Sequence, residues 1–252
     1  MDSEASPSLH GKVVLVTGAA RRVGSVIARH LHQRGASVVL HYRAAVADAE
    51  AQVATFNAAR PRSALAVQAD LRDTASLPLL VAESLACFGR LDGLVNNASS
   101  FFPTALGEID EVDWDDLVGS NFKAPLFLSQ AAAPALRASG GAIVNITDIH
   151  AERPLKGYPL YSAAKGALLT LTRALAVELA PAVRVNAVAP GPILWPDDGQ
   201  LDDAARVDIV RHTLLQREGS PDDIAGAVAY LLAAPYVTGQ VINVDGGRTA
   251  YL

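Results

Sequence analysis

The chain has 252 residues, a formal net charge of −5 and 50% hydrophobic residues, which suits one large α/β domain with a substantial core. The mild negative charge argues against nucleic acid or an anionic membrane as a main partner. A single cysteine, Cys87, excludes an internal disulfide framework, and its apolar helix-like surroundings predict a buried, inert thiol. No stretch approaches the ~18 apolar residues of a membrane span, and the acidic N-terminus lacks a signal-peptide core, which predicts a cytoplasmic protein.

Strand and helix patterns alternate along the chain. Short apolar runs rich in β-branched residues are typical of strands buried on both faces of a parallel sheet. The predicted strands cover 12–17, 37–42, 64–68, 91–96, 141–147, 183–188 and 240–244, and the predicted helices cover 23–33, 44–59, 75–88, 110–119, 125–138 and 158–179. This order predicts right-handed crossovers and a Rossmann-type doubly wound parallel sheet of about seven strands, with helices on both faces.

No change of composition divides the chain, so we predict one domain over residues 1–252. Its first residues, 1–10, are predicted to be a short flexible lead-in. Residues 190–220 form the irregular stretch, with proline, glycine, aspartate and Trp195. A span of this length inside a compact domain is usually a lid or binding loop. Trp195 is therefore a candidate to cover substrate, although an anchored loop aromatic without chemistry is the alternative.

The segment TGAARRVG, residues 17–24, lies between a predicted strand and a predicted helix. Gly18 allows a tight turn, and Gly24 allows close approach at the start of the helix. The free N–H groups and positive dipole of a helix N-terminus suit a pyrophosphate. A simple strand-to-helix turn without a ligand is the alternative, because one such turn is a weak signal alone.

The second predicted strand ends in Leu40-His41-Tyr42-Arg43-Ala44, without an acid. Folds that bind NAD place an aspartate or glutamate here for the ribose 2′-hydroxyl. Arg43 is able to pair with a 2′-phosphate instead, and Arg21 adds positive charge nearby. A solvated surface arginine is the alternative for Arg43, but the missing acid favours NADPH as the cofactor.

Tyr161 and Lys165 lie four residues apart in the predicted helix 158–179, and Asp148 lies 13 residues before the tyrosine (161 − 148 = 13). Residues at i and i+4 share one helix face. A nearby ammonium favours the phenolate, so we expect Lys165 to lower the pKa of Tyr161 towards the range of a general acid. An ordinary surface tyrosine and lysine are the alternative, because this spacing is common by chance.

Further motifs stand in a fixed order along the chain. They are Asp70-Leu71 after the third predicted strand, Asn96-Asn97-Ala98 after the fourth, Asn121, Tyr161 with Lys165, Pro190-Gly191 and Val244-Asp245-Gly246-Gly247. With Thr17, Gly18 and Gly24, they make the chain resemble the short-chain dehydrogenase/reductases over essentially its whole length.

The resemblance implies a set of roles. Asn121 would hold a water in a proton relay, and Lys165 would bond the nicotinamide ribose and lower the pKa of Tyr161. Asp70 and Leu71 would flank the adenine. The other implied cofactor contacts are Thr17, Gly18, Arg21, Arg22, Val23, Gly24, Tyr42, Arg43, Asn97, Ala98, Ser99, Thr147, Pro190, Gly191 and Ile193.

Two departures from the common family pattern are informative. Arg22 stands where the turn usually has another glycine, and Asp148 stands where the catalytic serine is usual. Both resemble the pteridine reductases, a branch of the same superfamily, as do His41-Tyr42-Arg43 and the segment NNASSFFPT, residues 96–104. In that branch the serine of this segment bonds cofactor and pterin, and the first aromatic lies over the pterin. The positions here are Ser99 and Phe101.

These residue types suit a flat, aromatic, hydrogen-bonding ring. Phe101 is able to stack on it, a carboxyl at position 148 is able to exchange protons with ring nitrogens, and Arg22 offers a planar donor fork. Phe101 as a core aromatic under a loop, and Asp148 as a helix cap, are the alternatives. The predicted substrate contacts are Arg22, Ser99, Phe101, Asp148, Tyr161 and Trp195.

We therefore expect an NADPH-dependent reductase that acts on a dihydropterin or dihydrofolate. The first alternative is a short-chain carbonyl reductase for a ketone or 3-oxoacyl substrate, and the second is a catalytically silent NADP-binding regulator. The histidines lack ligand spacing, so we predict no metal. The alanine- and leucine-rich helices 125–138 and 158–179 predict subunit contacts, which the family resemblance implies are those of a homotetramer. The alternative is that alanine is simply a good helix former.

Overall fold

The computed structural model describes residues 8–195 and 202–250. Its strands form one sheet in the order β3-β2-β1-β4-β5-β6-β7, and every pairing is parallel. The predicted doubly wound sheet is thus confirmed. The strands are β1 (Val13–Val16), β2 (Ser37–Tyr42), β3 (Ala64–Gln68), β4 (Gly93–Asn96), β5 (Ala142–Ile146), β6 (Arg184–Pro190) and β7 (Val241–Val244).

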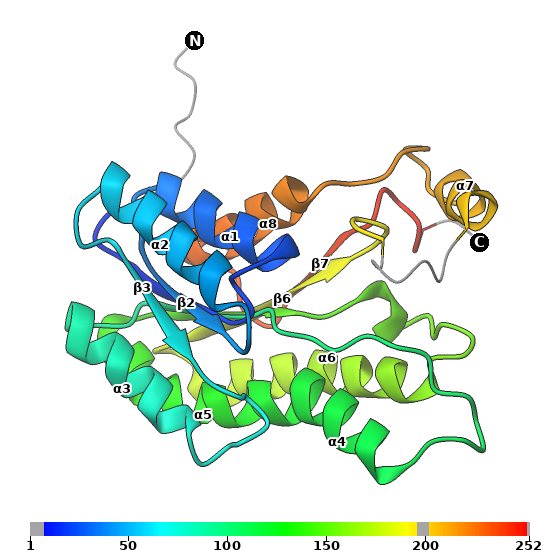
Figure 1. Cartoon of the computed structure of the whole chain (residues 1–252), viewed down its shortest axis with the longest axis horizontal. Coiled ribbons are helices and arrows are strands. Elements are labelled where there is room, and N and C mark those ends of the chain that lie inside the picture. The colour runs from blue at the N-terminus through cyan, green and yellow to red at the C-terminus, as the bar shows by residue number, and fades with distance from the viewer. Residues whose placement is uncertain (1–7, 196–201, 251–252) are drawn as a thin grey trace.

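Helices cover both faces of this sheet (Figure 1). One face carries α1 (Arg22–Gln33), α2 (Val46–Ala59) and α8 (Pro221–Ala233). The other carries α3 (Leu77–Phe88), α4 (Glu111–Val118), α5 (Ala124–Ser139) and α6 (Pro159–Leu179). Each face has its own apolar core because strand side chains alternate in direction. Within β1, Val14 and Val16 pack into the core beneath α1 and α8, whereas Val13 and Leu15 pack beneath α3 and α5.

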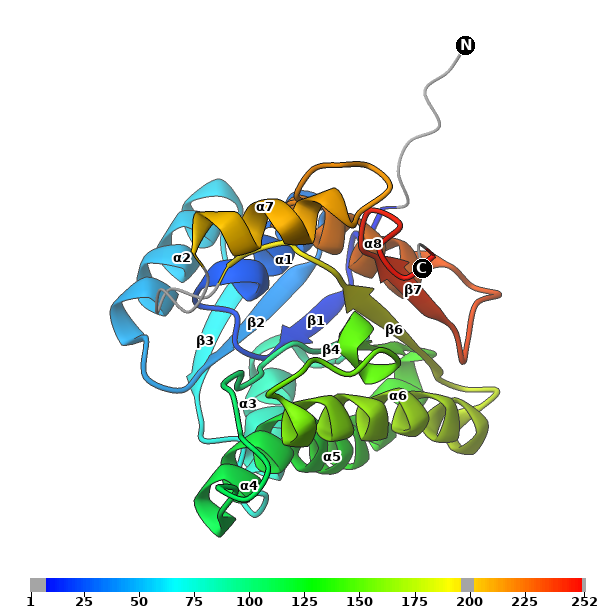
Figure 2. The same cartoon turned by 90° about the vertical axis from the view of Figure 1, so that its right-hand side faces the viewer.

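The order of the strands creates a crevice for a ligand. β1 lies between β2 and β4, so the chain winds one way from β1 to β3 and the other way from β4 onwards. In open α/β sheets, ligands bind at the carboxyl ends of the strands where this reversal occurs. Figure 2 shows the carboxyl ends of the strands between α7 (Asp203–Arg211) and α6, which lie on opposite sides of them.

Three elements differ from the sequence-based expectations. A π-helical turn, Gly119–Lys123, joins α4 to α5, so the two predicted helices form one continuous helical segment. The stretch 190–220 contains α7 and is not irregular throughout; its residues 196–201 lie outside the described part. We did not predict α8, although Ser220 and Asp223 form a capping box at its start.

One local expectation was wrong, and the structure bears on only part of another. Cys87 is exposed, because it lies on the outer side of α3. Leu9, within the expected flexible lead-in, is buried and its N–H donates to the Arg34 carbonyl, so the chain is packed before residue 10; residues 1–7 lie outside the described part. No helix in the described ranges is long and apolar enough to span a membrane.

Candidate active site

The turn between β1 and α1 is fastened to the loop that follows β4. The Thr17 hydroxyl accepts the N–H groups of Asn97 and Ala98, both at 2.9 Å. The Asn97 amide returns a bond to the Thr17 carbonyl at 2.9 Å. These bonds join two segments that we assigned to cofactor binding, the turn after β1 and the loop after β4.

The same turn has the shape of a phosphate cradle. A Cβ atom on Gly24 would lie 2.1 Å from the Gly18 carbonyl oxygen, and Gly18 itself has a φ of +62°. No side chain caps the start of α1, and its first turn contains no acid. The helix N-terminus therefore leaves room, backbone donors and a positive dipole for an anion. Val23, another predicted contact, is half-buried in this first turn.

Arg22 adopts a conformation that its side chain disfavours. Its φ is +53°, in the left-handed region where related turns favour glycine. For a residue with a Cβ this conformation costs about 1–2 kcal/mol. We therefore infer that an arginine is present at this position because its side chain has a role. That side chain reaches across to the 190–220 segment, where Nη2 donates to the Trp195 carbonyl at 2.9 Å.

At the position predicted to bind the 2′-phosphate of the cofactor, Arg43 is a cation without a salt bridge among the described residues. Arg43 is exposed at the end of β2, next to the half-buried Tyr42, and forms no salt bridge with any described residue. Arg21, in contrast, is engaged by Asp48 of α2, with 2.6 Å between Nε and the carboxylate. Arg43 is thus the better placed of the two to receive an anionic ligand.

His41 organises this region, and sequence reasoning noted it only as part of a family motif. Its Nδ1 accepts the Gly18 N–H at 3.1 Å, and its Nε2 lies 3.1 Å from the Ala69 carbonyl. Burial lowers the pKa of His41 to about 4, so the ring is neutral and Nε2 donates to Ala69. The histidine thereby ties the phosphate turn to the loop that begins at Asp70.

Asp70 and Leu71 occupy the predicted adenine position after β3. Leu71 is buried. The Asp70 carboxylate is gripped by the Arg72 guanidinium, with a shortest distance of 2.7 Å, and this hydrogen bonding lowers the pKa of Asp70 to about 2. Arg72 also bonds Asp116 of α4 at 3.0 Å. The loop is therefore held against α4, and its carboxylate remains ionised at physiological pH.

The three predicted catalytic side chains with charge or acidity lie together. The Tyr161 hydroxyl donates to Asp148 Oδ2 at 2.8 Å, and the Asp148 Oδ1 accepts the His150 backbone N–H at 2.8 Å. Asp148 thus also caps the short 3₁₀ helix Ile149–Ala151, so the predicted alternative role coexists with the bond to tyrosine. The buried Lys165 donates to the Ile146 carbonyl at 3.0 Å. The His150 ring faces the Arg153 carbonyl, so it forms no dyad with Asp148.

The acidities in this group differ from our expectation. Burial raises the pKa of Tyr161 well above its usual range, the Asp148 charge raises it further, and a hydrogen bond with Ser99 opposes the shift. The expected lowering of the pKa of Tyr161 by Lys165 is not found: the Lys165 ammonium donates to the Ile146 carbonyl and lies 5.7 Å from the centre of the phenol ring. Burial lowers the pKa of Lys165 itself to about 8. With its pKa raised, Tyr161 keeps its hydroxyl proton and donates it in the hydrogen bond to Asp148.

Asn121 is a structural partner of Ser99. Its Oδ1 accepts the Ser99 hydroxyl at 2.6 Å, and its Nδ2 donates to the carbonyls of Ser100 and Leu117 at 2.9 and 3.0 Å. The π-helical turn that carries Asn121 allows the second of these bonds, which reaches back four residues. Both polar atoms of the side chain are thus engaged in the loop after β4, and the water-holding role of Asn121 stays a prediction.

Phe101 contacts Tyr161, the predicted catalytic tyrosine, and it also has a second aromatic neighbour. Its ring stacks on Tyr158 with 4.7 Å between centroids and 15° between planes, and it meets Tyr161 edge-on at 4.8 Å. Phe101 is 37% exposed, so it is not the core aromatic of the alternative interpretation. Sequence reasoning missed Tyr158, which is the N-cap residue of α6, three residues before Tyr161.

The loop after β6 completes the site. The Gly191 N–H donates to Val244 at 3.0 Å, and a Cβ on Gly191 would lie 2.6 Å from Asp245 Cα, so only glycine fits this approach. Ile193, next to Pro190-Gly191-Pro192, is buried. The hydroxyl of Thr147, at the end of β5, donates to the Val188 carbonyl at 3.1 Å. Trp195 is anchored outside this group, and its Nε1 donates to Glu218 at 2.9 Å.

Comparison with known proteins agrees with this geometry. A family model described as enoyl-(acyl carrier protein) reductase matches residues 18–249. Pteridine reductase 1 of Leishmania tarentolae is 42% identical, with 93% of this chain and 95% of that protein aligned. A 3-oxoacyl-[acyl-carrier-protein] reductase of Staphylococcus aureus is 36% identical, over 94% of this chain and 97% of that protein.

Solved structures share the fold over nearly the whole chain. A blue fluorescent protein from a metagenomic library, solved in complex with NADPH, has a TM-score of 0.89 and 37% identity, covering 96% of this chain and 99% of its own. A variant of a Serratia marcescens short-chain dehydrogenase/reductase has a TM-score of 0.89 and 35% identity, with the same coverage. From the family match, the identities and these structures, we conclude that the chain belongs to the short-chain dehydrogenase/reductase family.

Proposed function

We propose that this protein is an NADPH-dependent reductase that transfers a hydride to a ring carbon of a pterin-type substrate, converting a dihydropterin or dihydrofolate to its tetrahydro form. The observation that carries the proposal is the hydrogen bond from the Tyr161 hydroxyl to the Asp148 carboxylate, at 2.8 Å. It puts a proton-exchanging carboxyl where the common family site has a hydroxyl. The 42% identity to pteridine reductase 1 of Leishmania tarentolae supports the same substrate class.

The residues present fit the cofactor. The cradle at Gly18 and Gly24 and the uncapped start of α1 would hold the pyrophosphate, and Arg43 would hold a 2′-phosphate. No acid stands at the end of β2 to favour NADH. When bound, NADPH supplies the hydride. Binding of NADPH by a solved structural neighbour supports this assignment.

The chain's own residues supply the proton. Tyr161 and Asp148 share a hydrogen bond, and the His150 N–H holds the second oxygen of the carboxylate in place. A basic ring nitrogen near these groups would take the proton from this pair, as in general acid catalysis. The ammonium of Lys165, which is 2% exposed, keeps positive charge beneath the site. Phe101 would position a flat ring above Tyr161.

A second candidate function is reduction of a 3-oxoacyl or other ketone substrate. The 36% identity to a 3-oxoacyl-[acyl-carrier-protein] reductase of Staphylococcus aureus favours it. Such a reaction develops negative charge on a carbonyl oxygen, which is best met by hydroxyl donors. A carboxylate at position 148 opposes that charge, so the geometry favours the pterin.

One assay separates the two candidates. NADPH oxidation is followed by absorbance with dihydrobiopterin, dihydrofolate, a 3-oxoacyl thioester and a generic ketone as separate substrates. We expect turnover with the reduced pterin or folate and little with the ketones. Turnover with a ketone alone would replace the proposal by the second candidate, and cofactor binding without any turnover would favour the silent NADP-binding regulator.

A further inference from the structure

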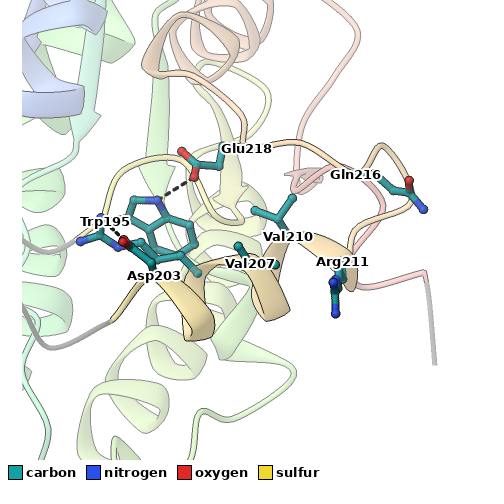
Figure 3. A pocket seen from close by; sticks show the side chains of 8 residues that line it. Trp195, Asp203, Val207, Val210, Arg211, Gln216 and Glu218 are labelled. Carbon is teal, nitrogen blue, oxygen red and sulfur yellow. Dashed lines mark hydrogen bonds and ion pairs between the residues drawn. The ribbon is translucent and has the colours of Figure 1, made fainter.

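A cavity of about 980 Å³ beside α7 belongs with the proposed site. Figure 3 shows Trp195 and Glu218 on its wall, where the indole Nε1 donates to the carboxylate at 2.9 Å. Trp195 lies in the stretch that we predicted to cover the substrate, so this cavity requires no separate function. A buried histidine to which the proposed function gives no role, His41, does require one.

His41 is a polar residue in a strand that favours apolar ones. It lies one residue before the end of β2 and is 2% exposed. Strands buried on both faces are usually filled by apolar side chains, and a buried polar group is costly unless it is hydrogen-bonded. The ring has two partners: Nδ1 lies 3.1 Å from the Gly18 nitrogen, and Nε2 lies 3.1 Å from the Ala69 carbonyl oxygen. These partners lie in two segments that are 51 residues apart (69 − 18 = 51).

The two bonds require an imidazole ring in one tautomer. A backbone N–H only donates, so Nδ1 is the acceptor from Gly18, and Nε2 carries the proton and donates to Ala69. Burial lowers the pKa of His41 to about 4, so the ring is neutral at physiological pH and keeps both bonds. An asparagine amide would place an acceptor near the Nδ1 position, and a glutamine amide a donor near the Nε2 position, but neither spans both partners.

On one side, His41 orients the phosphate turn, residues 17–24. Gly18 donates to the ring, and the N–H of Ala19 donates to the His41 carbonyl at 2.9 Å. Two successive amides of the turn are therefore directed to β2. The amides at the start of α1 have no side-chain cap, and they remain for an anion. His41 thus determines which donors of the turn are used inside the protein and which are left for the expected pyrophosphate.

On the other side, His41 holds the adenine loop, residues 69–72. Ala69 accepts from Nε2, and its own N–H donates to the Tyr42 carbonyl at 3.1 Å. Asp70, the next residue, is held from another direction by Arg72, which also bonds α4. The loop is therefore fixed to β2 at one end and to α4 at the other. Its position relative to the phosphate turn depends on the histidine that both segments contact.

We propose that His41 is a positioning residue for the ADP half of the cofactor, which sets the spacing between the phosphate turn and the adenine loop without contacting the cofactor itself. The inference rests on the proposed function in requiring a dinucleotide cofactor, and it holds for either candidate substrate. NADPH and NADH share the ADP half and differ in the 2′-phosphate. His41 therefore supports both cofactors equally, whereas Arg43 is expected to act on NADPH alone.

Calorimetric titration of the substrate-free protein with NADPH and with NADH tests the proposal. His41→Leu keeps a side chain of comparable volume and removes both bonds. We expect its affinity for both cofactors to fall about tenfold and by a similar factor, because binding must restore a turn and a loop that the free variant allows to relax. The kcat with a dihydropterin at saturating NADPH should stay within about twofold of wild type, because only binding is affected.

Conservative variants separate hydrogen bonding from space filling. His41→Asn keeps the acceptor for Gly18 and His41→Gln keeps the donor for Ala69, so each should recover part of the affinity that His41→Leu loses. If the ring only filled space, His41→Leu would bind as wild type does and the smaller His41→Asn would bind worst. That order would overturn the proposal.

His32→Leu is the matched control. His32 is also buried, at 6% exposure, and its Nε2 lies 2.7 Å from the Ser63 hydroxyl, directly before β3 and therefore at the amino ends of the strands. Both leucine variants remove a bonded imidazole, but only His41→Leu should weaken the cofactor. An equal loss of affinity in His32→Leu, or a loss in His41→Leu confined to NADPH, would overturn the proposal. Wild-type protein that binds neither cofactor would reject this inference and the proposed function together, whereas His41-dependent binding without pterin turnover would reject the proposed function alone.

Discussion

At the residue scale, the proposed choice of a pterin over a ketone depends on Asp148. Its carboxylate accepts the Tyr161 hydroxyl at 2.8 Å, and a serine hydroxyl there could not take up and release a proton in turn, as a carboxyl group does in a proton relay. We predict that Asp148→Ser lowers kcat on a dihydropterin by about 10²–10⁴-fold, the usual contribution of general acid catalysis. Tyr161→Phe should also impair turnover, and the double variant should be less than additive if both groups act in one relay.

Single-turnover NADPH oxidation by the wild type and the three variants is the measurement for Asp148. Cofactor affinity, measured separately by fluorescence, should change little, because the proposal assigns Asp148 to the substrate and not to the cofactor. Full dihydropterin activity in Asp148→Ser, together with ketone reduction by the wild type, would contradict the pterin assignment.

Arg43 is expected to set the choice of cofactor. It is exposed at the end of β2, without a salt bridge to any described residue. Charge-assisted bonds to a phosphate contribute roughly 1.5–3 kcal/mol each. Arg43→Asp should therefore weaken NADPH by about ten- to a hundredfold and leave NADH nearly unchanged.

Steady-state kinetics with both cofactors measure the effect of Arg43→Asp. Arg62→Asp is a matched control, because Arg62 is exposed in the turn before β3, at the amino ends of the strands, whereas the site lies at their carboxyl ends. Equal losses for NADPH and NADH in Arg43→Asp would argue against its phosphate role.

We expect the buried charge of Lys165 to lower the free energy of unfolding of the protein. Burial lowers the pKa of Lys165 from about 10.5 to about 8, so below pH 8 the folded protein carries the full cost of a buried cation. That cost disappears as the pH rises from about 8 to about 10.5, because the folded protein releases the proton before the unfolded chain does. We predict that Lys165→Met raises the free energy of unfolding at pH 7 by up to about 3 kcal/mol while abolishing turnover.

Urea unfolding of wild type and Lys165→Met across pH 7 to 10.5 checks both parts of this statement. The difference between the two proteins should shrink as the pH rises. A variant that is less stable than wild type at pH 7, or a difference that grows with pH, would show that the Lys165 bond to Ile146 outweighs the burial of charge.

At the scale of the elements, the strands were predictable because each is an apolar run buried on both faces. β1 and β5, for example, are buried throughout, and their runs stand out against polar neighbours. α7 has no buried residue, so no apolar periodicity distinguishes it from a loop. α8 did carry a start signal, the capping box of Ser220 and Asp223 followed by an apolar run, which we did not use.

The contacts inside the site depended on tertiary structure in the same way. The pairing of Tyr161 with Asp148 was expected from a motif, but the stacking of Phe101 on Tyr158 joins two loops 57 residues apart (158 − 101 = 57). The bridge from His41 to Gly18 and Ala69 likewise joins three segments. The direction of the pKa shift of Tyr161 follows from its burial and from the charge of Asp148 beside it, neither of which a sequence displays.

At the scale of the whole molecule, apolar side chains stay exposed on two helices that a monomer would be expected to cover. Phe127 of α5 is 37% exposed and Val177 of α6 is 78% exposed, and Ala163 and Ala174 of α6 are also exposed. On this basis we predict a homotetramer of D₂ symmetry, in which α5 and α6 of paired subunits form a four-helix contact. Light scattering at micromolar concentration should give four times 26.3 kDa, or about 105 kDa.

A matched pair of variants tests where the tetramer contact lies. Val177→Asp places a charge on the α6 face and should dissociate the assembly, because an unpaired buried charge at an interface is strongly unfavourable. Val112→Asp makes the same change on α4, where Val112 is 74% exposed outside the expected contact, and should leave the mass unchanged. A monomeric wild type would rule out the tetramer, and a tetrameric Val177→Asp protein would move the interface away from α6.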